Sequence, residues 1–159
     1  MCRDSVILLV EDNEDDVLLI RRALRKCAAA NPLQVVRSGE EAIEYLKGEG
    51  RYSNWAEFPL PDVVLLGLKL TGLDGFEVLK WIREQAGLKR LRVVVLTCSA
   101  LSQEIRLACD LGANSFLIKP ADTDRLVEMI RAFLDYWIRT DTGPDISRGI
   151  RATHSIRKL

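Results

Sequence analysis

The chain has 159 residues, which suits one domain with a substantial core, and its 48% hydrophobic and 29% charged residues are typical of a soluble globular protein. Because 23 Lys and Arg residues balance 23 Asp and Glu residues, net charge gives no general attraction to nucleic acid or to an anionic membrane. No apolar run approaches the roughly 20 residues of a membrane span and the first residues lack a signal-peptide pattern, so we expect a cytoplasmic protein without membrane or nucleic-acid partners.

Short apolar runs and longer amphipathic stretches alternate along the chain. The apolar runs predict strands at residues 5–10, 33–37, 62–66, 91–97 and 115–119. Apolar residues spaced by three or four predict helices at about 12–29, 38–48, 74–85, 101–111 and 122–139. We expect residues 5–139 to form one domain and residues 140–159, which include Gly143 and Pro144 and lack an apolar stripe, to form a solvated C-terminal tail.

Residues at the helix ends support these boundaries. Ser38 and Glu41 have the spacing of a capping box at the start of the second helix. The stretch TGLDGF reads as a turn in which Asp74 caps the third helix. Gly112 is expected to end the fourth helix. Five strands in strict alternation with helices predict a parallel sheet with helices on both faces.

Ligands of such sheets bind beyond the carboxyl ends of the strands. Glu11 and Asp12 follow the first strand, Thr97 ends the fourth, and Lys119 ends the fifth. Carboxylates can hold Mg²⁺, and a hydroxyl and an ammonium group can hold phosphate oxygens. This set suits phosphoryl transfer, but the third strand ends at Gly67, where a phosphoryl-accepting side chain would be needed.

Four motifs, ILLVEDNEDD, VVLL-x-LKLTGLDGFEVL, VVVLTCSA and LGANSFLIKP, resemble the receiver domain of two-component response regulators in order and spacing. The EFPLPD loop and the YWIR end of the last helix resemble the small single-domain regulators that partner bacterial phytochrome kinases. The resemblance implies an α/β, flavodoxin-like (CheY-like) three-layer fold with a five-stranded parallel sheet in the order 2-1-3-4-5. It also implies that a sensor histidine kinase donates a phosphoryl group, with Mg²⁺ required, to an aspartate at the end of the third strand.

The resemblance assigns roles to individual positions. Glu11 and Asp12 match the metal-binding acids, and Lys69 matches the residue whose backbone carbonyl binds the metal. The remaining matches are Thr97 for the switch hydroxyl, Phe116 for the aromatic switch residue, Lys119 for the family's lysine and Gly67 for the phosphoacceptor aspartate.

Gly67 is therefore the departure from the family pattern. A glycine cannot form an acyl phosphate, and losing one carboxylate is expected to weaken Mg²⁺ binding and to let Lys119 pair with Asp12. We expect a pseudo-receiver in a phosphorelay that is not an enzyme and acts by protein–protein binding. Two alternatives stay open: an ordinary phospho-accepting receiver with an engineered or sporadic Asp-to-Gly change, and a plain interaction or dimerisation module.

Three secondary expectations concern other side chains. Asp12 and Asp74 are considered as substitute phosphoacceptors, but structural roles are favoured for both, with Asp74 in a turn and helix cap. Cys98 is expected to fill a core position rather than to act as a redox switch. The apolar excess near Tyr136 and Trp137 indicates a homodimer through the last helix.

Overall fold

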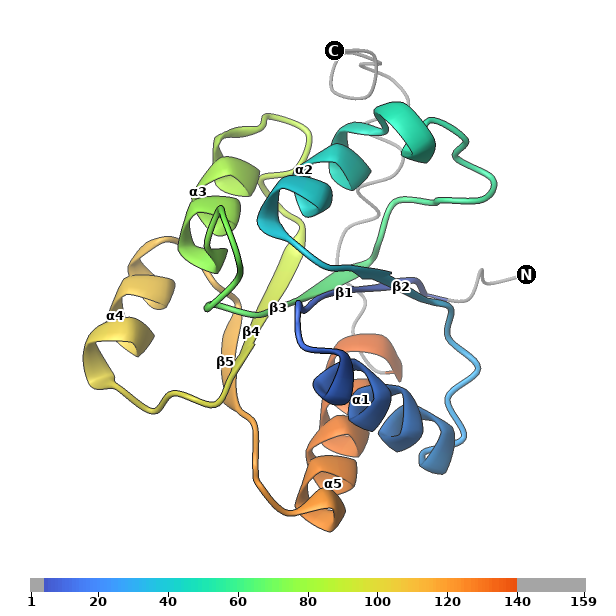
Figure 1. Cartoon of the computed structure of the whole chain (residues 1–159), viewed down its shortest axis with the longest axis vertical. Helices are drawn as coiled ribbons and strands as arrows, with labels where there is room; N and C mark the ends of the chain where they lie inside the picture. Colours follow the sequence, from blue (N-terminus) through green and yellow to red (C-terminus); the bar gives the residue numbers. More distant parts are fainter. Residues whose placement is uncertain (1–4, 140–159) are drawn as a thin grey trace.

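The computed structural model describes residues 5–139 as one parallel sheet flanked by helices (Figure 1). The strand order is β2-β1-β3-β4-β5, as the resemblance implied. The strands are β1 (Ile7–Val10), β2 (Leu33–Val36), β3 (Val63–Leu66), β4 (Arg92–Thr97) and β5 (Ser115–Ile118). The helices are α1 (Glu14–Lys26), α2 (Gly39–Lys47), α3 (Gly75–Glu84), α4 (Ser102–Asp110) and α5 (Thr123–Phe133), with a 3-10 turn η1 (Gly50–Tyr52) and a π-helical segment η2 (Leu134–Arg139).

The two faces of the sheet carry separate hydrophobic cores. Helices α1 and α5 cover one face and α2 and α3 cover the other, with α4 beside β4 and β5 (Figure 1). Along β1, Leu8 and Val10 pack with the α2–α3 core, whereas Ile7 and Leu9 pack with the α1–α5 core. Because both faces of the central strands are covered, β1 and β3 are continuously apolar rather than alternating.

Parallel registers align the carboxyl ends of neighbouring strands. Val10 of β1 pairs with Val36 of β2 and with Leu66 of β3. On the other side of β3, Leu66 pairs with Val95, and Thr97 at the end of β4 pairs with Ile118 of β5. The residues that follow β1, β3, β4 and β5 therefore meet at one edge of the sheet.

The helix caps agree with the sequence at one end and correct it at another. Asp74 and Glu77 form a reciprocal capping box at the start of α3, and Gly112 follows α4 with a φ of 96°. At α2, Ser38 accepts from the Glu41 amide, but the Glu41 carboxylate accepts from the Arg37 amide (2.9 Å) and from the Tyr52 hydroxyl. The predicted box is thus half formed, because Glu41 also anchors the loop after α2.

The last helix reaches residue 139 as predicted, but it changes from an α-helix to the wider η2 at Leu134, where no proline or glycine marks the change. Cys98 is exposed at the turn after β4, so the expectation that it fills a core position is wrong.

Within the described part of the chain, no helix has both the length and the apolar character needed to cross a bilayer. The predicted tail, residues 140–159, lies outside the described residues.

Candidate functional site

The carboxyl edge of the sheet brings together most of the residues expected there. The Glu11 amide donates to the Val36 carbonyl (3.1 Å), and the Gly67 amide donates to the Val10 carbonyl (3.0 Å). The Lys119 amide donates to the Thr97 carbonyl (2.7 Å). These backbone bonds extend the ladders by one residue beyond the strands, so each candidate side chain starts from a fixed backbone position.

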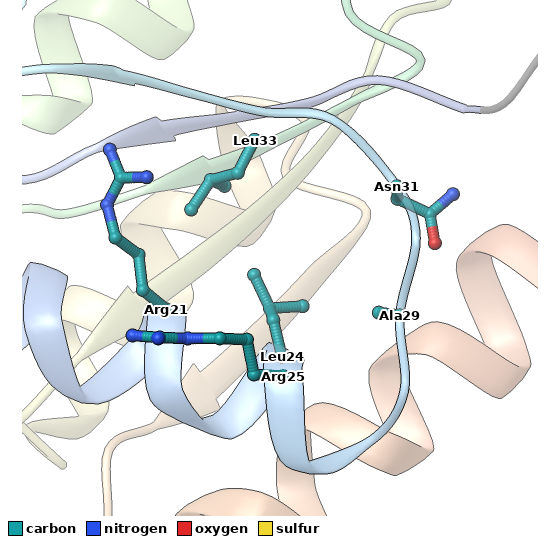
Figure 2. Close-up of a pocket in the computed structure, with 6 residues that line it drawn as sticks. All are labelled: Arg21, Leu24, Arg25, Ala29, Asn31 and Leu33. Carbon is teal, nitrogen blue, oxygen red and sulfur yellow. The ribbon is translucent and has the colours of Figure 1, made fainter.

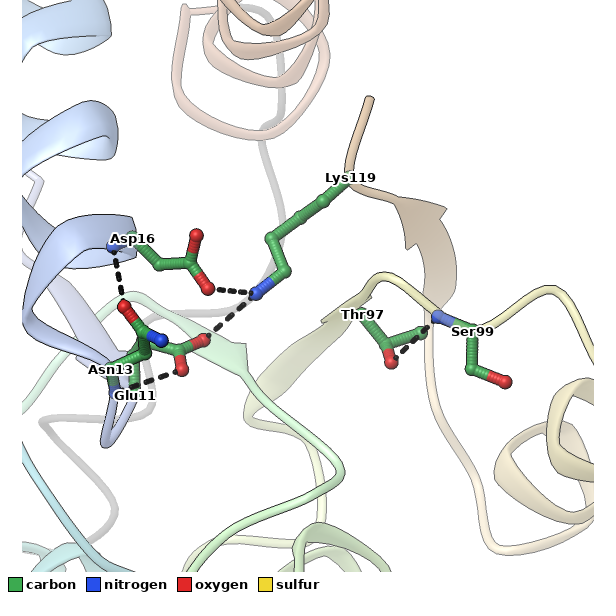
Figure 3. Close-up of polar contacts among 6 residues, drawn as sticks. All are labelled: Glu11, Asn13, Asp16, Thr97, Ser99 and Lys119. Carbon is green, nitrogen blue, oxygen red and sulfur yellow. Dashed lines mark hydrogen bonds and ion pairs between the residues drawn. The ribbon is translucent and has the colours of Figure 1, made fainter. Parts of the chain in front are cut away.

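A three-membered ionic cluster occupies the centre of this edge (Figure 3). Lys119 Nζ lies 2.8 Å from Asp16 Oδ2 and 3.2 Å from Glu11 Oε2. The Lys119 and Glu11 side chains are only 15% and 7% exposed, whereas that of Asp16 is 32% exposed. We call Glu11, Asp16 and Lys119 the lysine cluster. Its partly buried bonds hold the ammonium group between β1 and the first turn of α1.

Asp16 was not predicted as a site residue, and Asp12 was predicted to pair with Lys119. The structure corrects this: Asp12 Oδ2 accepts from the Thr71 amide (3.1 Å) and hydroxyl (3.0 Å). Asn13 caps α1, because its side-chain oxygen accepts from the Asp16 backbone amide (3.1 Å). The backbone amide of Asn13 donates to Glu11 Oε1 (3.2 Å). The cap starts α1 so that Asp16, not Asp12, lies on the side of Lys119.

Burial and charge act differently on the two ends of this ion pair. Burial raises the pKa of the Glu11 carboxyl above its usual value and outweighs the lowering effect of Lys119. For Lys119, burial alone would lower the pKa, but the hydrogen bonds and charges of Asp16 and Glu11 raise it overall. Lys119 is therefore firmly cationic at neutral pH.

Gly67 is buried at the end of β3, close to this cluster. A Cβ atom added there would lie 3.4 Å from Glu11 Oε2 and 3.0 Å from the Val10 carbonyl oxygen. A side chain at position 67 would thus start beside Glu11, after a small adjustment of the backbone. Gly75 closes the following turn, where any Cβ would collide with the Gly67 carbonyl oxygen.

The other predicted residues lie at the edge but outside the lysine cluster. Thr97 is buried, and its hydroxyl accepts from the Ser99 amide (3.2 Å), apart from the lysine cluster in Figure 3. Phe116 is half-buried against a small core that contains Leu68 and Val95. Lys69 lies in the turn after β3 with an exposed side chain. Asp74 is engaged in its helix cap, as predicted.

The two acids predicted to bind Mg²⁺ are both engaged in contacts within the fold. Among residues 5–139, no group of three or more His, Cys, Asp or Glu side chains could hold a metal. Of the two predicted acids, Glu11 is bonded to Lys119, and Asp12 is bonded to Thr71. A divalent cation that used both carboxylates would compete with Lys119 for Glu11 and with Thr71 for Asp12.

Comparison with known proteins identifies a matching family and a similar relative. The family "Response regulator receiver domain" matches residues 7–131. The response regulator Rcp1 of Synechocystis sp. (strain ATCC 27184 / PCC 6803 / Kazusa) is 35% identical over 140 residues, which cover 88% of this chain and 93% of Rcp1.

Two solved structures are similar throughout the fold. The phosphorylated cyanobacterial phytochrome response regulator RcpA is 37% identical with a TM-score of 0.83, covering 90% of this chain and 100% of RcpA. The Mn²⁺-bound form of Rcp1 is 34% identical with a TM-score of 0.80, covering 89% of this chain and 99% of that structure.

Proposed function

The chain belongs to the response regulator receiver domain family of two-component signalling, and we propose that it is a single-domain pseudo-receiver that acts by protein–protein binding without phosphorylation. The observation that carries this proposal is Gly67. It follows β3 next to Glu11, at the position that the motif pattern assigns to the phosphoacceptor. With no carboxylate at this position, the chain has no group there to form an acyl phosphate.

The lysine cluster supports a silent site. In phosphoryl transfer a lysine offsets the charge of phosphate oxygens. Here the Lys119 ammonium is already held by Asp16 and Glu11 at 2.8 and 3.2 Å. We infer that Asp16 stabilises Lys119 where an acceptor carboxylate is missing. Mg²⁺ binding should be weaker than in a receiver with three acids, because only Glu11 and Asp12 remain.

Partner binding is then expected to be constant rather than switched. A conformational shift needs a ligand that prefers one state, and without a phosphoryl group no such ligand acts at this edge. Three large apolar side chains, Leu101, Leu107 and Ile118, are 60%, 44% and 43% exposed on and beside α4 and β5. They offer contact area to a partner protein without any rearrangement of Thr97 or Phe116.

The relatives guide the choice of partner. One similar structure is a phytochrome response regulator in its phosphorylated form. We therefore propose a sensor histidine kinase of a bacterial phytochrome system as the partner, in the cytoplasm, with no catalytic turnover by this chain. The chain would bind the kinase constantly, or would compete with a phospho-accepting regulator for binding to the kinase.

A phosphorylation assay tests the proposal. The chain is incubated with Mg²⁺ and acetyl phosphate, or with a phosphorylated histidine kinase, and its intact mass is recorded beside two variants. Gly67→Asp restores the carboxylate, whereas Gly67→Ala adds the same Cβ without it and serves as the matched control. We expect a gain of one phosphoryl mass in Gly67→Asp alone. If the unmodified chain is labelled, another carboxylate accepts the phosphoryl group and the pseudo-receiver assignment is wrong.

A further inference from the structure

A surface groove of about 450 Å³ lies far from the lysine cluster, at the carboxyl end of α1 (Figure 2). Arg21 and Arg25 lie on successive turns of α1 and line one side of the groove. Leu24 and Leu33 form an apolar floor between α1 and β2, and the loop with Ala29 and Asn31 forms the opposite wall. The groove thus combines two guanidinium groups with an apolar surface.

The charges of α1 are divided between its two halves. Two of the three acids in the first turn are paired within the fold, because Asp16 pairs with Lys119 and Glu14 pairs with Arg37 (2.7 Å). The second half carries Arg21, Arg22, Arg25 and Lys26. Within residues 5–139, the side chains of Arg21 and Arg25 have neither a hydrogen bond nor an ion pair to another residue. The helix dipole favours cations only in the last turn, so it accounts for Arg25 but not for Arg21.

The loop that forms the far wall is fixed in place. Ala28 follows the α1 cap with a φ of 53°, the one positive φ among the described non-glycine residues. This left-handed turn, which is unfavourable for a residue with a Cβ, reverses the chain. The Asn31 side-chain amide then donates to the Ser5 carbonyl (3.1 Å). The groove therefore has a preformed shape, which limits the entropy lost on binding.

We propose that this groove binds an acidic and apolar peptide segment of a partner protein, with a carboxylate on Arg21 and Arg25 and a neighbouring apolar side chain on Leu24 and Leu33. Guanidinium groups match carboxylates in fork-like geometry, and apolar contact supplies the remaining affinity. The inference extends the proposed function by naming a second contact surface, but it does not depend on the chemistry at Gly67.

Peptide fits the groove better than nucleic acid does. Nucleic-acid binding depends on many phosphate contacts, whereas this groove presents two arginines. Phosphates would also leave the partly exposed Ala29 and Leu33 uncovered. A side chain such as Leu, placed next to Asp or Glu, would use both parts of the surface.

Titration of the isotope-labelled full chain, followed by its amide and arginine side-chain resonances, tests the proposal. The probes are short peptides of alternating Asp and Leu, alternating Asn and Leu, and alternating Asp and Gly. We expect saturable shifts at Ala29, Asn31 and Leu33 with the Asp–Leu peptide, and binding about tenfold weaker for either control peptide, since each lacks one class of contact. Equal binding of all three peptides would overturn the proposal.

Paired variants locate the contact. Arg21→Glu with Arg25→Glu should abolish the shifts, and the milder Arg21→Gln with Arg25→Gln should weaken binding about tenfold. Arg22→Glu with Lys26→Glu makes the same charge change on the same helix outside the groove and should leave the groove shifts in place. Equal loss in both pairs would indicate diffuse charge attraction and refute the site. Equal displacement of the peptide by inorganic phosphate would show that the groove is a simple anion site. Groove shifts caused by Asp145→Asn alone would show that the chain's own C-terminal segment occupies the groove. Either result contradicts the proposal.

Discussion

A single ammonium group organises the carboxyl edge of the sheet. Lys119 reaches back from the end of β5 to carboxylates that follow β1 and begin α1. Removing one member of a buried ionic cluster leaves another charge poorly compensated, so such clusters are strongly coupled. Because Asp16 is about one-third exposed, water weakens its share of that coupling.

We predict that Asp16 and Lys119 stabilise each other. In a double-mutant cycle of Asp16→Asn and Lys119→Met, urea unfolding at neutral pH should give a coupling energy of about 1 kcal/mol. The same cycle with Asp12→Asn is the matched control and should give no coupling, because Asp12 is bonded to Thr71 instead. A larger coupling through Asp12 would contradict this assignment of the cluster.

The sequence predicted the place of the site better than its contacts. Strand alternation is enough to bring Glu11, Gly67, Thr97 and Lys119 to one edge, because parallel strands end together. It could not show which acid of EDNEDD meets Lys119. That choice depends on the Asn13 cap and on the Thr71 turn, which hold Asp16 and Asp12 in different directions.

The long connection between α2 and β3 shows how an element without a strong pattern becomes ordered. The Tyr52 ring of η1 packs at a tilt against Tyr45 of α2 and edge-on against Phe58 of the loop, with ring centroids 5.0 and 4.9 Å away. The Tyr45 hydroxyl donates to the Pro59 carbonyl (2.6 Å). The Tyr52 hydroxyl donates to the Glu41 carboxylate, which also accepts a hydrogen bond from the Arg37 amide. The connection is therefore packed against α2 rather than loosely attached.

Tyr52 should make the stability of the fold depend on pH in the alkaline range. Burial, together with the hydrogen bond and charge of Glu41, raises the pKa of the Tyr52 hydroxyl above its usual value. Above pH 10 the unfolded chain releases this proton while the folded chain keeps it, so the free energy of unfolding falls as pH rises. Urea unfolding at neutral and at strongly alkaline pH should show a smaller loss in Tyr52→Phe. An identical pH dependence in both proteins would refute this role.

Periodicity predicted where the helices lie, but not how each one ends. Apolar spacing placed all five helices, since one face of each must cover the sheet. The π-helical end of the last helix was missed because Leu134 and Trp137 fit the apolar stripe of either helix type. The half-formed cap at Ser38 was missed because Glu41 serves the distant Tyr52, which local spacing cannot reveal.

Residues 5–139 form a sheet with a hydrophobic core on each face and a polar edge at the carboxyl ends of the strands. Both cores contain fully buried side chains from β1 and β3, so the edge residues are held by a close-packed interior. With Gly67 at the position expected for the phosphoacceptor, we propose that signalling by this domain depends on its exposed surfaces. The last helix is one of them, because Tyr136 is 66% exposed.

We predict a homodimer formed through the last helix. Tyr136 packs edge-on against Trp137, with ring centroids 4.8 Å apart, and forms an aromatic surface of the kind enriched in interfaces. Tyr136→Lys should raise the dimer dissociation constant about tenfold, as measured by sedimentation equilibrium. Leu18→Lys removes another exposed apolar side chain, on α1, and should leave dimerisation unchanged. A monomer at all concentrations, or equal effects of both changes, would refute this interface.

We expect the carboxyl edge of the sheet to stay in one state. The most direct test is the amide spectrum of the full chain, recorded before and after addition of Mg²⁺ and acetyl phosphate, beside Gly67→Asp. We predict unchanged resonances at Thr97, Phe116 and Lys119 in the chain itself and clear shifts in Gly67→Asp. Shifts of these three residues in the unmodified chain would show that the edge still responds to metal and phosphoryl donor, and would contradict a single-state edge.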